Sequence, residues 1–211
     1  MCKKRAIIFL CFLTLMITTG CVPMMKLSNQ EADIYQKIHR KFSQMTAYTA
    51  TVKLTVKNNR TEQVYEMHQA VKTPEYARTE LTAPEELSGV VTVYAGNELL
   101  VRRADGEEPL RLEAKEGYSD FFIHDFFARY YQSEDTALIV SAGTGESETM
   151  LLETVANPES SSRYKITMLL DTKKLEPKTI TVYDIGGNVR MIAEFSEFCY
   201  NPALHDGMFT T

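Results

Sequence analysis

Alternation of apolar and polar side chains is the main pattern in residues 28–211. From position 48 to position 57, the even-numbered residues are apolar and the odd-numbered residues are Thr or Lys. Side chains of a strand point alternately to opposite faces, so this segment predicts a strand with one buried and one solvent-facing side. Similar segments between Gly, Asn, Asp and Pro turn residues predict ten more strands, at 61–72, 76–81, 89–95, 98–103, 109–114, 136–141, 149–156, 163–170, 178–184 and 189–199.

Two segments have helical periodicity instead. Ser28 and Glu31 have the spacing of a capping box, and apolar residues follow at positions 34, 38, 42 and 45. A second predicted helix starts after Ser119 and carries aromatic residues around much of its circumference. We therefore expect a mainly β (α+β) fold, in which a large curved antiparallel sheet forms an unclosed barrel of roughly eleven strands with helices packed in its concave face.

The N-terminus has the features of an export signal. Basic residues occupy positions 3–5, and the apolar run 6–17 that follows is about 18 Å long as a helix, too short for a hydrocarbon core of about 30 Å. Thr19 and Gly20 directly precede Cys21, and this arrangement resembles the lipobox of bacterial lipoproteins, in which the thiol carries a diacylglycerol and becomes the first residue. The alternative is a plain secretory signal in which Cys21 is incidental.

These features predict three parts: a lipoprotein signal peptide at 1–20, a lipidated tether at 21–27 and a single domain at 28–211. The protein is then exported and lipid-anchored on the outer face of the cytoplasmic membrane, or on the outer membrane of a cell that has one. The covalent diacylglycerol at Cys21 is the only non-protein group that we expect.

Charge and cysteine content narrow the function further. The formal net charge is −5, and removal of the leader leaves 20 basic against 28 acidic side chains, a net charge of −8. Such a surface is a poor match for phosphate backbones, so no nucleic-acid partner is expected. Outside the leader only Cys21 and Cys199 remain, which predicts no internal disulfide. Because Cys199 follows Phe195 and Phe198, we expect it to be a small buried hydrophobe.

The sequence offers little catalytic chemistry. The four histidines, His39, His68, His124 and His205, are scattered without metal-ligand spacing. The segment 143–147 matches neither a nucleophile elbow nor a phosphate loop and is interpreted as a hairpin turn. The neighbours His124 and Asp125 are interpreted as the solvent-facing edge of the aromatic helix. We therefore expect no enzyme, no catalytic residue and no metal site.

A set of turn and strand motifs resembles the lipoprotein-carrier superfamily, which includes LolA, LolB and the sensor domain of RseB. The motifs are residues 72–76, 93–100, 175–177 and 184–188, together with the ending from Asn201 to Phe209. The resemblance implies an unclosed barrel with helices over an apolar hollow. Thr73 replaces the Arg that precedes the matching Pro in LolA. A lipid-anchored member with this change is similar to the clostridial germination lipoproteins that include GerS, which bind a cortex-modifying amidase.

Three functions remain open, of which the first two are the leading candidates. The first is a membrane-anchored, non-enzymatic lipoprotein that binds and activates a cell-envelope or spore-cortex enzyme in sporulation or germination, with an exposed strand edge that could also pair two copies as a homodimer. The alternative is a carrier or receptor for acyl chains of lipoproteins or lipids. Its predicted apolar cavity is lined by Val52, Leu54, Val91, Val93, Phe121, Phe122, Phe126 and Phe127. The same eight residues fit ordinary core packing equally well. The third candidate function is a stress sensor that binds stray lipoproteins.

Overall fold

A computed structural model describes residues 29–74, 76–96, 98–106, 108–141 and 149–210. The chain separates into two compact units, Met1–Asp33 and Ile34–Thr211, and the second unit contains every described strand. The predicted signal peptide, Cys21, Ser28 and the segment 143–147 lie outside the described residues. Within the described ranges, no helix has the length and apolar character needed to cross a membrane.

All eleven predicted strands are present in the described part of the chain, and they form one antiparallel sheet. The strands are β1 (Ala47–Lys57), β2 (Glu62–Lys72), β3 (Tyr76–Ala83), β4 (Val91–Ala95), β5 (Glu98–Arg102), β6 (Leu110–Glu113), β7 (Thr136–Ser141), β8 (Thr149–Val155), β9 (Lys165–Asp171), β10 (Glu176–Tyr183) and β11 (Val189–Tyr200). The helices are α2 (Asn29–Ser43), α3 (Ile123–Gln132) and the short 3-10 helices η1 (Glu85–Leu87) and η2 (Asp206–Phe209).

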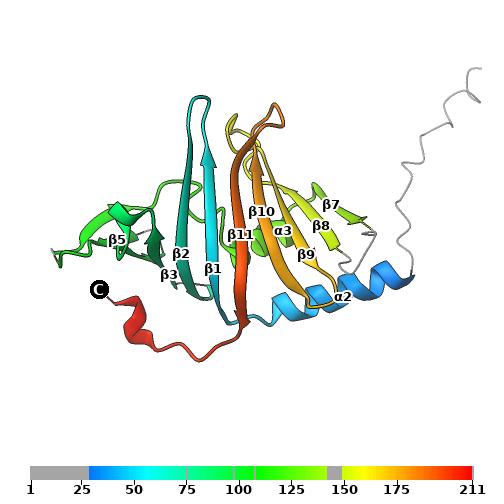
Figure 1. The fold of residues 1–211 in the computed structure, drawn as a ribbon. Coiled ribbons are helices and arrows are strands. Elements are labelled where there is room, and N and C mark those ends of the chain that lie inside the picture. Colours follow the sequence, from blue (N-terminus) through cyan, green and yellow to red (C-terminus); the bar gives the residue numbers. More distant parts are fainter. Residues whose placement is uncertain (1–28, 75, 97, 107, 142–148, 211) are drawn as a thin grey trace, which may run out of the picture. The chain divides into compact units, whose positions relative to one another are not determined.

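The strand order keeps the sheet open. Across the sheet the order is β6-β5-β4-β3-β2-β1-β11-β10-β9-β8-β7. The first and last strands, β1 and β11, therefore lie side by side in the middle of the sheet (Figure 1). Val52 of β1 lies opposite Phe195 of β11. Among the described residues, β6 and β7 are the two edges and do not pair with each other. The predicted unclosed barrel of eleven strands is confirmed.

Both helices pack against one face of the sheet, which we call the helix-covered face. Ile38 of α2 and Phe126 of α3 belong to the same core cluster as Val52 of β1. The rings of Phe42 in α2 and Phe127 in α3 stack with their centroids 4.4 Å apart. Because the apolar residues of β1 alternate with polar ones, only one side of the strand contributes to this core. The predicted packing of helices in the concave face is confirmed.

The C-terminal segment covers part of the opposite face, which we call the outer face. Phe209 of η2 packs against Val91 and Val93 of β4 in a second, smaller core cluster. Lys72 of β2 and Asp206 of η2 form an ion pair beside it. The side chains of both clusters lie between residues 34 and 209, so a chain that starts at residue 22 keeps the complete core.

A bulge in β11 determines which face of the sheet the side chain of Cys199 points to. The register with β1 shifts next to Thr49, and Glu197 adopts a left-handed backbone conformation with φ of 51°. The bulge moves the alternation by one residue, so that Phe195 and Phe198 both pack against the core although they are three positions apart. Cys199 lies opposite Thr49 and is exposed, so its predicted burial is wrong.

Helix α3 begins at Ile123 and not directly after Ser119. The carbonyl of Ser119 accepts a hydrogen bond from the Phe122 N–H at 2.9 Å in a turn that precedes the helix. The N–H of Ile123 donates to the hydroxyl of Tyr48 at 3.2 Å, and Tyr48 in turn donates to Oε1 of Gln69 at 2.7 Å. A buried tyrosine of β1 thus satisfies the N-terminus of the helix, which is the role that the sequence assigns to Ser119.

The exposure of Cys199 is testable on the chain that starts at residue 22, in which it is the only cysteine. Because reactivity requires access to the sulfur, we expect a thiol reagent such as DTNB to modify the folded protein quantitatively without denaturant. Absorbance of the released thiolate measures the reaction, and the same chain in urea gives the total thiol. Modification that appears only in urea would mean that Cys199 is buried and that the bulge is misplaced.

Candidate functional site

The segment from Tyr118 to Tyr130, which includes most of α3, packs against the helix-covered face of the sheet together with α2, and we call it the aromatic segment. Phe122 and Phe126 are 0% and 1% exposed. The Phe122 ring lies 4.6 Å from the ring of Phe121 and 6.2 Å from that of Tyr94 on β4, centroid to centroid. Aromatic rings at these separations pack favourably. Side chains of the protein itself therefore occupy much of the helix-covered face.

A buried carboxylate fixes the start of this segment. Asp120 is 2% exposed and receives two hydrogen bonds from Arg163, Nε–Oδ2 at 2.6 Å and Nη2–Oδ1 at 3.0 Å. Arg129 of α3 places Nη1 2.9 Å from Oδ1 of the same carboxylate. Burial alone lowers the pKa of Arg163, but its hydrogen bonds with Asp120 and the negative charge there outweigh burial and raise it. Asp120 thus ties the loop before β9 to α3 and to the turn before it.

Gly117 allows this arrangement. Its φ is 89°, a conformation that residues with a Cβ rarely adopt. A Cβ at this position would lie 2.3 Å from Nε of Arg163, so any side chain would displace the guanidinium. The sequence places glycine where the arginine has to pass close to the backbone.

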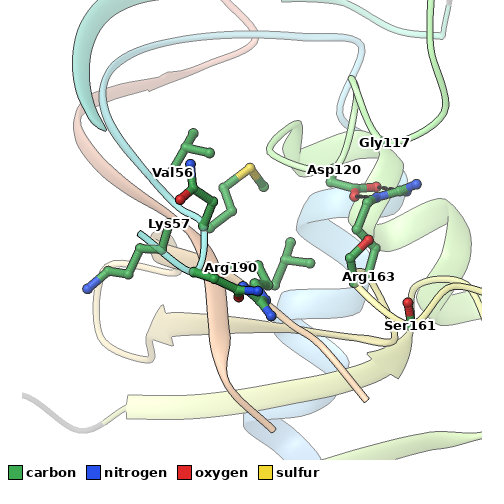
Figure 2. A pocket seen from close by; sticks show the side chains of 12 residues that line it. Val56, Lys57, Gly117, Asp120, Ser161, Arg163 and Arg190 are labelled. Carbon is green, nitrogen blue, oxygen red and sulfur yellow. Dashed lines mark hydrogen bonds and ion pairs between the residues drawn. The ribbon is translucent and has the colours of Figure 1, made fainter. Parts of the chain in front are cut away.

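A cleft of about 530 Å³ opens beside this ion-paired cluster. It is lined by Val56, Lys57, Asn58, Asn59, Gly117, Asp120, Ser161, Ser162, Arg163, Val182, Arg190 and Met191. Figure 2 shows Asp120 and Arg163 on one side of the cleft and Val56 and Arg190 on the other. Val56 lies opposite Met191 in the β1–β11 pair, and Met191 lies opposite Val182 in the β10–β11 pair. These three side chains therefore form an apolar strip on the helix-covered face at the end of the strands.

The second arginine of the cleft is also held by a carboxylate. Asp184 is 6% exposed, and its Oδ2 lies 2.7 Å from Nη2 and 2.9 Å from Nε of Arg190. The backbone N–H of Asn188 donates to Oδ1 of Asp184 at 2.8 Å, and this bond, together with the Asn188 side chain and Arg190, holds the pKa of Asp184 below its ordinary value. Nη1 of Arg190 donates to Oδ1 of Asn59 at 2.7 Å. The guanidinium groups on both sides are therefore oriented before any ligand arrives.

The cleft is suited to binding. Its lining contains no His or Cys, and no group of three His, Cys, Asp or Glu side chains in the described ranges could hold a metal ion. The apolar strip can accept a hydrophobic side chain or chain end, and the arginines and asparagines can bond to acceptors on the same ligand. Nothing in the sequence points to this cluster, because Asp120 and Arg163 are 43 positions apart and surrounded by unrelated patterns.

The structure separates the eight residues predicted to line an apolar cavity. Six lie in the core between the helices and the sheet, namely Val52, Leu54, Phe121, Phe122, Phe126 and Phe127. Val91 and Val93 lie on the outer face, because Val93 pairs with Arg78, whereas Ala77 and Tyr94 point to the helices. The expectation that all eight line one hollow is wrong for these two valines. None of the eight lines the cleft described above.

His124 and Asp125 are more enclosed than predicted. Their side chains are 12% and 24% exposed, and Nε2 of His124 lies 3.0 Å from Oδ1 of Asp125. Burial raises the pKa of Asp125, but the hydrogen bond and charge of His124 and a hydrogen bond with Ser119 more than offset it, so that the pKa is lowered. The pair is a contact within the aromatic segment, and it lies on the less buried side of α3, where it is only partly solvent-facing.

Removal of the Asp120 carboxylate tests the ion-paired cluster. Asp120→Ala leaves the guanidinium groups of Arg129 and Arg163 without their shared counter-charge, so we expect the free energy of unfolding to fall by about 3 kcal/mol. Glu116→Ala is the matched control, because its 70% exposed carboxylate lies 3.5 Å from Nη1 of Arg163 and should contribute less than about 0.5 kcal/mol. Urea denaturation followed by circular dichroism measures both. Equal effects would contradict the assignment.

An open antiparallel barrel with two helices on one face is a fold that this chain shares with solved proteins of low sequence identity. The chain belongs to the family of YdcC-like sporulation proteins, whose family model matches residues 3–209. A comparison with curated proteins found no match.

Solved structures share the fold at low sequence identity. An uncharacterized conserved protein from Thermus thermophilus has a TM-score of 0.53 and 13% identity, over 85% of this chain and 92% of that one. A chain in the structure of the CwlD amidase from Clostridioides difficile in complex with the GerS lipoprotein has a TM-score of 0.50 and 22% identity, over 84% and 100%. A candidate outer-membrane lipoprotein-sorting protein domain from Vibrio parahaemolyticus has a TM-score of 0.50 and 12% identity, over 84% and 95%.

Proposed function

We propose that this sporulation-family protein is a non-enzymatic lipoprotein of the cell envelope that binds, and thereby activates, an enzyme acting on the cell wall or spore cortex. It is anchored through a diacylglycerol on Cys21 to the outer face of the cytoplasmic membrane. The family match supports the setting in sporulation. The shared fold with a chain of the GerS–CwlD complex supports a protein partner, because GerS is a lipoprotein that has been solved bound to an amidase.

The observation that carries this proposal is the filling of the helix-covered face by the aromatic segment. A carrier needs an empty apolar hollow, whereas here Phe122, Ile123 and Phe126 are each at most 1% exposed among side chains of the sheet and α2. A protein whose inner face is already filled recognises other molecules with its surface. The cleft between Val56 and Arg163 is the preformed concave part of that surface.

The cleft fits a partner side chain that has an apolar body and a hydrogen-bond acceptor at its tip. Val56 is 36% exposed and presents the apolar strip, and Arg163 and Arg190 stand on either side with their guanidinium groups held by Asp120 and Asp184. Fixed donors around an apolar strip favour one ligand orientation and lose little entropy on binding. A residue of the partner enzyme anchored here would bring the two proteins together in a single geometry.

The proposal is tested by measuring direct binding of this protein to a CwlD-type amidase from the organism that produces it. We expect isothermal titration calorimetry with the chain that starts at residue 22 to give a 1:1 complex. Val56→Glu places a charge in the apolar strip, and we expect it to weaken binding at least about tenfold, a typical effect at an interface anchor. Val64→Glu is the matched control, because Val64 is 41% exposed on the outer face of neighbouring β2 and its substitution should leave the affinity unchanged.

Three outcomes would contradict the proposed binding of a partner enzyme. These are absence of binding, equal loss in both variants, and an amidase-independent hydrolytic activity of this chain. The acyl carrier remains the second candidate, because Val56, Val182 and Met191 could accept the end of an acyl chain. A copurified lipid in the native mass spectrum, displaced by a fluorescent fatty acid, would favour the carrier over the partner-binding protein.

The anchor is tested in cells of the native host. Two acyl chains contribute about 0.8 kcal/mol per buried methylene, which makes membrane attachment effectively stable. We therefore expect Cys21→Ala to move the protein from the membrane pellet to the soluble extracytoplasmic fraction, as measured by immunoblotting after ultracentrifugation. If the variant pellets at wild-type levels, another part of the chain attaches the protein to the membrane.

A further inference from the structure

A group of basic side chains lies where α2 meets the turn between β9 and β10, and we call it the basic face. It consists of Lys37, Arg40 and Lys41 of α2 and of Lys173 and Lys174 of the turn. Nζ of Lys41 donates to the backbone carbonyl of Lys174 at 3.3 Å, so the helix and the turn are in direct contact. Residues three and four apart are neighbours on a helix surface, so Lys37 lies beside both Arg40 and Lys41.

The turn holds its two lysines in a defined conformation. Oδ1 of Asp171 accepts hydrogen bonds from the backbone N–H groups of Lys173 and Lys174, each at 3.0 Å. Leu175 follows with a left-handed φ of 55° and packs its side chain against the core. The backbone is therefore fixed on both sides of the two lysines, and both of their side chains are exposed.

The basic face is positive in a protein that is otherwise strongly negative. The segments 33–44 and 171–178 together carry six basic and three acidic side chains, a net charge of +3. The rest of the chain from residue 21 onward carries 14 basic and 25 acidic side chains, a net charge of −11. Of the acidic residues in the two segments, Asp171 already has Nζ of Lys178 3.4 Å from its Oδ2. Positive charge gathered on one face of a negative molecule attracts a negative partner to that face alone.

Chain length keeps the basic face close to the bilayer that would hold the proposed anchor. Seven residues, 22–28, separate Cys21 from the first residue of α2, and they span at most about 25 Å. Lys37 follows Asn29 by eight residues, which is about 12 Å along a helix. The basic face can therefore reach the membrane surface while Cys21 is anchored.

We propose that the basic face rests on an anionic bilayer, with Arg40, Lys173 and Lys174 beside the phosphate groups of the lipid heads. Each basic residue near a negatively charged membrane adds to the attraction, which falls off within a Debye length, about 10 Å at 0.1 M salt. The contact is shallow, because none of the exposed large apolar side chains of the described residues belongs to the basic face.

This contact holds the cleft away from the membrane. Strand β10 begins at Glu176, next to the turn, and Val182 near its other end lines the cleft. Six residues of a strand span about 20 Å, so the basic face and the cleft lie at opposite ends of β10 (Figure 1). A partner enzyme in the cleft is then held on the side that faces the cell wall. This orientation rests on the proposed function, whereas the lipid contact does not.

Vesicle binding without the anchor tests the basic face. The chain that starts at residue 22 is mixed with sucrose-loaded vesicles of phosphatidylglycerol and phosphatidylcholine in equal parts, and co-sedimentation at low salt measures the bound fraction. We expect binding that weakens as salt is raised and that is absent with phosphatidylcholine alone. One basic residue changes the partition coefficient about fivefold, so Arg40→Gln with Lys173→Gln and Lys174→Gln should weaken binding about a hundredfold.

A second triple variant is the matched control. Arg103→Gln with Arg111→Gln and Lys115→Gln removes three charges from exposed positions outside the basic face and should bind the vesicles like the wild type. Equal binding to vesicles of phosphatidylcholine alone, or equal loss in both triple variants, would overturn the proposal. Absence of binding to the anionic vesicles would also overturn it and would favour an acidic protein as the occupant. These results leave the cleft untouched, because neither the amidase nor the anchor is present.

Energy transfer measures the orientation. Cys199 precedes Tyr200, whose ring centroid lies 5.4 Å from Nζ of Lys41, so it is at the end of β11 next to the basic face. Arg60 lies in the turn after β1, where its N–H donates to Asn58, a residue that lines the cleft. On anionic vesicles with acceptor lipids, a dye on Cys199 should transfer more energy than a dye on Arg60→Cys in a Cys199→Ser chain. Equal transfer, or more from position 60, would overturn the orientation.

Discussion

Burial of the aromatic segment against one face of the sheet is the interaction on which the rest of the structure depends. An open sheet of eleven strands exposes a wide apolar face, and of the described helices only α2 and α3 cover it. Phe122 and Phe126 provide much of the apolar area that covers this face of the sheet, since an aromatic side chain covers far more surface than an aliphatic one. Each such ring contributes about 1.5–3 kcal/mol when it is withdrawn from water. Without them the sheet would have to bind another molecule or close on itself.

In the function that we propose, this internal cover leaves recognition to the margins of the sheet. An open barrel with an empty face suits a carrier, whereas here the face is filled and the rim and edges of the sheet remain available. The cleft at Val56 lies at the ends of β1, β10 and β11, and the free side of β6 lies at the sheet edge. The proposed binding surface therefore lies at the rim of the sheet, apart from the face that the helices fill.

The sequence predicts local structure well and long-range relations poorly. All eleven strands follow from alternation and turn residues, because both signals are local. The burial of Cys199 was mispredicted because a bulge at Glu197 reverses the alternation, and nothing in the neighbouring residues marks that bulge. Val91 and Val93 were assigned to the wrong face because the sequence does not reveal that Phe209 covers the outer side of β4. Strand patterns define two faces but do not say which one the helices take.

The cleft could not be predicted from the sequence for a related reason. Its arginines act through carboxylates that are distant in the chain or hidden in a turn, and a pairing such as Asp120 with Arg163 exists only after folding. The start of α3 is similar, since its N-terminal N–H is satisfied by Tyr48 from β1 rather than by a local cap. Local rules fail where a tertiary contact supplies the same hydrogen bond.

These polar contacts explain how an apolar segment comes to rest in one position. Hydrophobic burial has no direction, so several placements of the rings would remove similar areas from water. Asp120 accepts hydrogen bonds only where Arg163 and Arg129 converge, and Tyr48 meets Ile123 only when α3 starts at that residue. Buried ion pairs add little net stability, but they penalise every placement that leaves a charge without its partner. The carboxylate that positions the rings also orients Arg163 toward the cleft, so the packing of the core and the shape of the binding surface are set by the same side chain.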